Sequence, residues 1–163
     1  MWHGASVVTW DEFAEVEPEL ASACRALMYQ FGVGLAFLAT IRSDGAPRLH
    51  PMCPLIAESG LFAFLILSPK RDDLHRDGRY AMHSFPADEN EDAFSLTGVA
   101  EPVDDPGQRR ELQAQFLEER ELEEPPERFD EQELFAFRIE RCLDTVTTGH
   151  GDPAPRHRVW RAP

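Results

Sequence analysis

The sequence is poor in cysteine and has no long apolar run. Its three cysteines, Cys24, Cys53 and Cys142, are widely spaced and form no CxxC pair. This spacing argues against a disulfide scaffold or a structural zinc site, and it fits a reducing compartment. The longest apolar run, Leu61 to Leu67, is strand-sized, whereas a bilayer span needs about 20 residues. Since Met1 to Gly4 do not begin a signal peptide pattern, we expect a cytoplasmic protein without a membrane partner.

The sequence also lacks the spacings that mark several enzyme classes. Its six histidines show no HxxxH or HExxH spacing, so we expect no metal site. There is no GxSxG sequence around a nucleophilic serine, and Gly32 and Gly34 lack the third glycine of a dinucleotide-binding fingerprint. Cys53 has no obvious base partner. These absences leave the catalytic residues unknown at this stage.

Basic residues are outnumbered, because thirty acidic residues face sixteen basic ones and the net charge is -14. Such a charge repels the phosphate backbone of nucleic acids and the surface of anionic membranes, so we expect neither as a partner. The charge is uneven, however. Residues 118–133 are densely acidic, while residues 70–79 and 156–161 are locally basic. Local basic segments on an acidic protein favour a small anionic ligand.

The beginning of the chain has the pattern of helices. Thr9 and Glu12 have the spacing of a capping box, and Pro18 is suited to the first turn of a second helix. Six residues then share one helical face: Leu20, Ala21, Cys24, Leu27, Met28 and Phe31. We expect residues 9–31 to be helical and peripheral, within an N-terminal segment, residues 1–33, that packs on the rest of the domain.

From residue 35 onward the apolar period changes to two, which is typical of strands. Strands are expected at residues 35–41, 47–57, 61–67, 80–85, 92–103 and 134–147, with a short last one at 156–161. Helices after Ser68 and Asp105 interrupt this series. Short strands joined by tight turns pair antiparallel, and six or seven of them imply a closed or partly closed barrel. We therefore predict one mainly β (α+β) domain spanning residues 1–163.

The Ser68-Pro69-Lys70 sequence is a candidate anion site, because it ends a strand and begins a helix. Backbone N–H groups at a helix N-terminus attract anions, and Lys70 adds a full positive charge. Asp72 and Asp73 follow in the first turn, where carboxylates suit the helix dipole. The alternative is an ordinary helix start with a solvated lysine.

The neighbouring strand, residues 47–57, is expected to be irregular. Pro51 and Pro54 remove ladder donors, which leaves backbone groups free for a ligand. The residues from His50 to Cys53 would then present both backbone groups and side chains to a planar ring.

Four motifs in one order resemble a known family. They are Leu38-Ala39-Thr40-Ile41-Arg42-Ser43-Asp44-Gly45-Ala46-Pro47, then His50-Pro51-Met52, then Ser68-Pro69-Lys70-Arg71-Asp72-Asp73-Leu74, and then Asp77-Gly78-Arg79-Tyr80-Ala81. This series is similar to the pyridoxamine 5′-phosphate oxidase-like family of FMN-binding split barrels. The similarity covers roughly residues 34–103. It implies a six-stranded antiparallel split β-barrel with flanking helices, which works as a homodimer with FMN at the interface.

The resemblance also implies roles at the phosphate end of the cofactor. Lys70 is similar to the lysine that binds the FMN phosphate, and Leu67, Ser68 and Arg71 belong to the same phosphate turn. His50 stands where the family often has a basic residue near the phosphate and the ribityl chain.

At the ring end, the same resemblance points to two segments. Pro51, Met52 and Cys53 occupy the strand whose backbone faces the flavin ring. Trp160 and Arg161 resemble C-terminal aromatic and basic residues that reach a flavin site.

The sequence departs from the vitamin B6 oxidase itself. That enzyme has an arginine and a downstream lysine on the second strand, where this chain has His50 and Leu55. The departure argues against pyridoxine phosphate as the substrate. Three functions stay open: an FMN-dependent oxidoreductase acting on a small organic substrate, a reductase that uses the deazaflavin coenzyme, and a flavin-binding protein without turnover.

Overall fold

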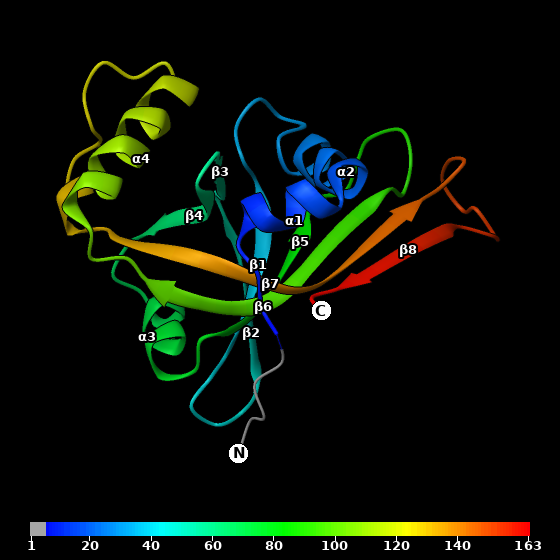
Figure 1. Cartoon of the computed structure of the whole chain (residues 1–163), viewed down its shortest axis with the longest axis horizontal. Helices are drawn as coiled ribbons and strands as arrows, with labels where there is room; N and C mark the ends of the chain where they lie inside the picture. The colour runs from blue at the N-terminus through cyan, green and yellow to red at the C-terminus, as the bar shows by residue number, and fades with distance from the viewer. Residues whose placement is uncertain (1–5) are drawn as a thin grey trace.

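Eight strands form one curled antiparallel sheet, and four α-helices flank it (Figure 1). The structure is a computed structural model that describes residues 6–163. Met1 to Gly4, on which the expectation about a signal peptide rests, lie outside the described residues. Within residues 6–163, none of the helices combines the length and the apolar character that a bilayer span requires.

The elements follow one another in the order that the sequence pattern predicts. The helices are α1 (Trp10–Val16), α2 (Pro18–Met28), α3 (Pro69–Arg76) and α4 (Pro106–Glu119), with a short 3-10 turn η1 (Phe129–Glu131). The strands are β1 (Ala36–Ile41), β2 (Pro47–Met52), β3 (Leu55–Ala57), β4 (Gly60–Leu65), β5 (Arg79–Ser84), β6 (Ala93–Pro102), β7 (Glu133–Val146) and β8 (Arg156–Arg161).

The predicted mainly β (α+β) barrel-like fold is confirmed, but the strand count differs from six. The strands lie in the order β2-β1-β5-β6-β7-β4-β3, and β8 pairs with the C-terminal half of β7. One extra strand arises because residues 47–57 divide at Cys53-Pro54 into β2 and β3. Pro54 has no N–H to donate, so a continuous ladder through this point is disfavoured. The other extra strand is β8.

The break at Cys53-Pro54 also closes the sheet. Strands β2 and β3 stand at opposite ends of the strand order, yet only these two residues join them. The sheet must therefore curl until its two edges come close together, as a split barrel does. Gly34 packs against this corner so tightly that a Cβ built on it would lie 1.9 Å from the Pro54 carbonyl oxygen.

The N-terminal helices form as the sequence predicts. In the capping box of α1, the Thr9 N–H donates to the Glu12 carboxylate at 2.8 Å, and the Glu12 N–H donates to the Thr9 hydroxyl at 3.4 Å. Pro18 occupies the first turn of α2. The inner faces of both helices pack on the sheet, where Phe13 and Cys24 are fully buried in the main core.

The sheet has one buried face and one open face. Directly opposed residues on antiparallel strands point to the same side. Leu38 of β1 and Met82 of β5 are opposed and fully buried, whereas Ala39 and Ala81 are opposed and more accessible. The α1 and α2 helices pack on the buried side (Figure 1). The two faces of β1 are therefore buried to different degrees within one chain.

We predict that Gly34→Ala lowers the free energy of unfolding by about 1–3 kcal/mol, because the added Cβ must displace the Pro54 carbonyl. Urea denaturation followed by fluorescence measures this change. The matched control is Gly107→Ala in α4, where the new Cβ meets only an Asp105 side-chain oxygen at 3.1 Å. Alanine favours a helix, so this control should equal or slightly exceed the wild type. Equal midpoints for the two variants would contradict the packing argument.

Candidate functional site

The barrel opens where β2 departs from β4. Leu55 of β3 pairs with Phe62 of β4, and a straight continuation of this register would put Cys53 opposite Phe64. Instead the chain turns at Cys53-Pro54 and pairs with β1 as β2. Among the described residues, the end of β4 has no strand partner on this side. We call this opening between the ends of β2 and β4 the split, and its strand ends keep backbone groups available for a ligand.

The turn after β4 leads directly from the split into α3. Ser68 stands at the N-cap position as predicted, but its hydroxyl donates to the Ile66 carbonyl at 3.0 Å and does not cap the helix. Pro69 follows at the first position, where no N–H is needed. Within residues 6–163, the Lys70 N–H has no hydrogen-bond acceptor. The start of α3 therefore retains capacity to bind an anion.

Lys70 is the only lysine of the chain, and it is half-buried at this helix start. Burial lowers the pKa of its ammonium group from the ordinary value, while the electrostatic influence of Cys53 acts in the opposite direction. The structure thus brings Lys70 and Cys53 near each other across the split. In the described part of the chain, the Lys70 ammonium has no hydrogen bond or ion pair. A half-buried cation without a carboxylate partner suits an anionic ligand.

Strand β2 presents alternate residues to this region. Arg48, His50 and Met52 point to the inner side of the sheet, while Leu49 and Pro51 are exposed on the open face. Met52 is buried in the core, so only its backbone is available to a ligand. His50 is half-buried, one step along the inner face from the Arg48 side chain that contacts α3.

A buried carboxylate fixes α3 beside β2. Asp73 accepts hydrogen bonds from Arg48 Nε at 2.7 Å, from the Thr40 hydroxyl at 2.9 Å and from Arg76 at 3.0 Å. Arg76 also donates to the Ile41 carbonyl. These contacts join α3 to β1 and β2, so they determine where the helix start and Lys70 lie. We call Asp73, Thr40, Arg48 and Arg76 the α3 anchor.

The sequence-based interpretation of Asp73 as a helix-dipole residue is wrong. Its carboxylate is buried, with only 3% of the residue exposed, and its partners come from two strands. Burial alone would raise the pKa of Asp73, but the hydrogen bonds from Arg48, Thr40 and Arg76 outweigh it and hold the pKa below the ordinary value. The only sign of this ion pair in the sequence is Arg48, an arginine at an inner position of β2. Which carboxylate it pairs with depends on the tertiary fold.

Arg71 and Leu67, the other two predicted residues of this turn, have contacts of their own. The Arg71 guanidinium lies 3.4 Å from the Glu133 carboxylate and donates to the Glu131 carbonyl at 3.2 Å. Its charge is therefore already paired with Glu133, the first residue of β7. Leu67 is 68% exposed and lines a cavity that Lys70 does not line.

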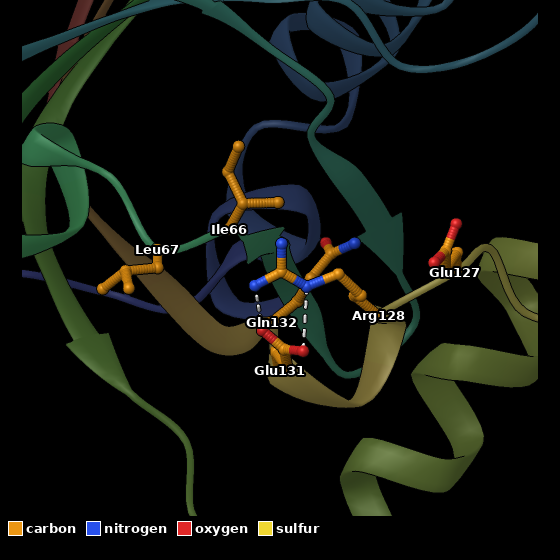
Figure 2. A pocket seen from close by; sticks show the side chains of 6 residues that line it. All are labelled: Ile66, Leu67, Glu127, Arg128, Glu131 and Gln132. Atoms are coloured by element: carbon orange, nitrogen blue, oxygen red, sulfur yellow. Dashed lines mark hydrogen bonds and ion pairs between the residues drawn. The ribbon is translucent and has the colours of Figure 1, made fainter.

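Figure 2 shows this cavity, which holds about 230 Å³ beside the turn. Its lining is Ile66, Leu67, Glu127, Arg128, Glu131 and Gln132. Arg128 binds the Glu131 carboxylate through two hydrogen bonds, of 2.9 and 2.6 Å (Figure 2). The Arg128 backbone has a φ of 60°, a left-handed conformation that disfavours non-glycine residues. The cavity starts at the residues that precede Ser68, but neither Ser68 nor Lys70 lines it.

Trp160 lies elsewhere in the chain. It pairs with Cys142 across β7 and β8, and its ring packs on Phe13 of α1 with centroids 5.0 Å apart. In Figure 1, α3 lies at the lower left of the molecule and β8 at its right. Of the predicted residues, the structure therefore gathers His50, Pro51, Met52, Cys53, Ser68 and Lys70 around the split. It does not bring Trp160 there within one chain.

Within residues 6–163, no group of three or more His, Cys, Asp or Glu side chains is arranged to hold a metal ion. All three cysteines are unpaired, and Cys53 is the exposed one.

Comparison with known proteins gives a match in structure but not in sequence. No protein-family model matches the chain, and no curated protein matches it. A haem-binding protein from Mycobacterium smegmatis has a TM-score of 0.61 and 16% identity, over 86% of this chain and 57% of that one. The chain therefore spans little more than half of that protein. A structure described as an F420 reductase has a TM-score of 0.58 and 21% identity, over 72% and 94% of the two chains.

A third similar structure comes from Clostridium acetobutylicum. It is related to general stress protein 26 of B. subtilis and is described as belonging to the pyridoxinephosphate oxidase family. Its TM-score is 0.58 at 13% identity, over 93% of this chain and 95% of that one. At such identities the likeness shows the fold, so the predicted resemblance to split barrels is confirmed at that level.

We predict that Asp73→Ala costs about 3–5 kcal/mol of stability, because it leaves the Arg48 charge without its buried partner. The pH dependence has a definite sign. Because the folded-state pKa of Asp73 is depressed, its contribution is complete above the pKa of the unfolded chain and is lost as pH falls through the lower folded-state pKa.

Acid unfolding followed by circular dichroism tests this sign. Asp73→Asn should remove the part of the acid-induced loss that Asp73 causes below about pH 4. Its exposed neighbour supplies the control, Asp72→Asn, which should stay within about 0.5 kcal/mol of the wild type. If Asp73→Asn changed the acid-unfolding curve no more than Asp72→Asn does, the α3 anchor would not stabilise the fold.

Proposed function

We propose that this chain binds FMN at the split and acts as an oxidoreductase on a small organic substrate. The observation that carries the proposal is Lys70. It is a half-buried cation at an uncapped helix start, without a hydrogen bond or ion pair to any other described residue. Such an arrangement suits a phosphate group, which accepts charge-assisted hydrogen bonds from both the ammonium group and the backbone N–H.

The donor groups at the split fit a flavin mononucleotide. Lys70 and the start of α3 would hold its phosphate, with the Ser68 hydroxyl and His50 close by. The interrupted backbone from Pro51 to Cys53 would lie along the ring, since the Cys53-Pro54 break removes ladder pairing there. Arg71 contributes less in this arrangement, because its guanidinium is already paired with Glu133.

Bound flavin would supply the hydride or electron transfer, while the protein supplies position and electrostatics. The α3 anchor holds the helix start in place, so the Lys70 charge is fixed before the ligand arrives. The cavity at Ile66 and Leu67 offers a small substrate space beside the same turn. No side chain at the split has the pairing that would identify a general acid or base.

A deazaflavin coenzyme is the second candidate, because it also carries a phosphate and one of the similar structures is described as an F420 reductase. Two of the similar structures are described as haem-binding or haem-storage proteins, which makes haem a third possibility to test. The phosphate-type site favours FMN or the deazaflavin over haem, whose iron needs an axial ligand such as histidine. His50 is the one histidine among the residues gathered around the split, and Cys53 is the other candidate ligand there.

We further propose a homodimer with the cofactor at its interface. The open face of the sheet carries small or apolar residues on its central strands, among them Ala39 and Ala81. Leu49 on this face is 64% exposed. Broad apolar faces of this kind mark association sites. The three unpaired thiols fit a cytoplasmic location for this function.

The absorption spectrum of the purified protein tests the cofactor. We expect flavin bands near those of free FMN, either as isolated or after addition of FMN and removal of the excess. A deazaflavin spectrum would favour the second candidate, and a haem spectrum would contradict the proposal. A protein that takes up neither FMN nor the deazaflavin would refute flavin binding.

We predict that Lys70→Ala weakens FMN binding roughly 10- to 150-fold, the loss of one charge-assisted hydrogen bond of about 1.5–3 kcal/mol. Fluorescence titration measures the affinity. Riboflavin, which lacks the phosphate, should bind both proteins equally. The control variant is Arg110→Ala on the exposed surface of α4, which should bind FMN as the wild type does.

The single lysine allows an independent check. An amine-reactive reagent can label only Lys70 and the N-terminus, and FMN should protect Lys70. Unprotected labelling together with unchanged FMN affinity in Lys70→Ala would place the phosphate elsewhere.

A further inference from the structure

The free edge of β3 is bonded to side chains where a further strand would otherwise lie. β3 stands at the end of the strand order, and among residues 6–163 its only strand partner is β4. Its central residue, Ile56, is buried. The Ile56 N–H donates to the Tyr29 hydroxyl at 2.9 Å, and the Ile56 carbonyl accepts from the Gln115 side-chain amide at 2.9 Å. Both backbone groups of this buried edge residue are therefore satisfied by side chains.

The Tyr29 hydroxyl also reaches the corner at Cys53-Pro54. It lies 3.5 Å from the Pro54 carbonyl oxygen and 3.2 Å from the Glu119 carboxylate. Burial raises the pKa of Tyr29 to about 12, so the hydroxyl keeps its proton at neutral pH. A protonated phenol can accept from the Ile56 N–H while it donates to Glu119 or to Pro54. One side chain therefore contacts both ends of the segment from Pro54 to Ile56.

Gln115 reaches the same segment from a different helix. Its amide nitrogen donates to the Ile56 carbonyl and, at 2.8 Å, to the Glu119 carboxylate. Glu119 therefore accepts hydrogen bonds from both Gln115 and Tyr29, and it joins the end of α2 to α4. We call Tyr29, Gln115 and Glu119 the corner network. All three lie outside residues 34–103, the part of the sequence that carries the family resemblance.

We propose that Tyr29 and Gln115 are positioning residues for the flavin ring. This inference rests on the proposed function, in which the backbone from Pro51 to Cys53 lies along the ring. That backbone runs directly into Pro54, so the orientation of its peptide groups depends on how the corner is held. The two side chains act through Pro54 and Ile56 and need no contact with the ligand. A backbone fixed in advance binds a planar ring without a further cost of ordering.

Two ligands distinguish this role from a purely structural one. If the corner network only stabilises the fold, its loss lowers the free energy of unfolding and leaves the affinity of the folded protein unchanged. If it positions the ring, its loss weakens riboflavin and FMN by the same factor, because riboflavin has the ring but no phosphate. Loss of Lys70 should instead affect FMN alone.

The variants are Tyr29→Phe, which removes only the hydroxyl, and Gln115→Met, which removes the amide and keeps the side-chain length. The chain has two tyrosines, so Tyr80→Phe is the matched control for the first variant. The Tyr80 hydroxyl donates to the Arg138 carbonyl at 3.2 Å and has no contact with the corner. Gln113→Met on α4 is the control for the second. The Gln113 side chain has no hydrogen bond to any residue from 6 to 163.

FMN and riboflavin are titrated by fluorescence into each full-length variant, under conditions where circular dichroism shows that the variant is folded. We expect Tyr29→Phe and Gln115→Met each to weaken both ligands equally, by roughly 3- to 30-fold. The visible absorption bands of the bound flavin should also shift from their wild-type positions. Both controls should keep wild-type affinities and spectra. In Tyr29→Phe/Lys70→Ala the separate losses in FMN affinity should multiply, because the two residues serve different ends of the ligand.

Three results would overturn the inference while leaving the proposed function intact. They are riboflavin affinity unchanged in both variants, a loss confined to FMN, or an equal loss in the matched controls. Should Tyr29→Phe fail to fold, Gln115→Met decides the question on the same criteria. A wild-type protein that binds neither FMN nor the deazaflavin would contradict the proposed function itself.

Discussion

The bonds that Asp73 accepts position the rest of the candidate site. Through them, Thr40 of β1 and Arg48 of β2 hold α3 against the sheet, and Arg76 of α3 itself is the third donor to the carboxylate. The other links of α3 to the barrel are the buried Leu74 side chain and the more exposed contacts of Arg71 and His75 with Glu133. A buried carboxylate tolerates few arrangements, because each lost partner leaves an unpaired charge in a poorly hydrated place. Because few arrangements satisfy the Asp73 carboxylate, the α3 anchor fixes the position of the helix start and therefore of the Lys70 charge.

The second constraint is the corner at Cys53-Pro54. It divides one expected strand into β2 and β3, curls the sheet and creates the split. Gly34 allows the corner to pack closely because it has no Cβ. One local feature, a proline without an N–H, therefore affects both the closure of the fold and the availability of backbone groups for a ligand. The fold and the candidate site depend on the same few residues.

The open face of the sheet is the surface on which we propose that a second copy docks. Its central side chains are small, which lets another sheet approach closely.

The sequence alone determined the elements and the helix start at Ser68-Pro69-Lys70, because caps, prolines and apolar periods act between residues close along the chain. It also indicated the irregular strand around Pro51 and Pro54. Only the tertiary structure decided that Asp73 turns inward to Arg48, that Arg71 pairs with Glu133, and that Trp160 lies far from the split in its own chain. Those outcomes depend on strand register and on the curl of the sheet, which bring together residues from distant parts of the sequence. Local patterns carry no information about such pairings.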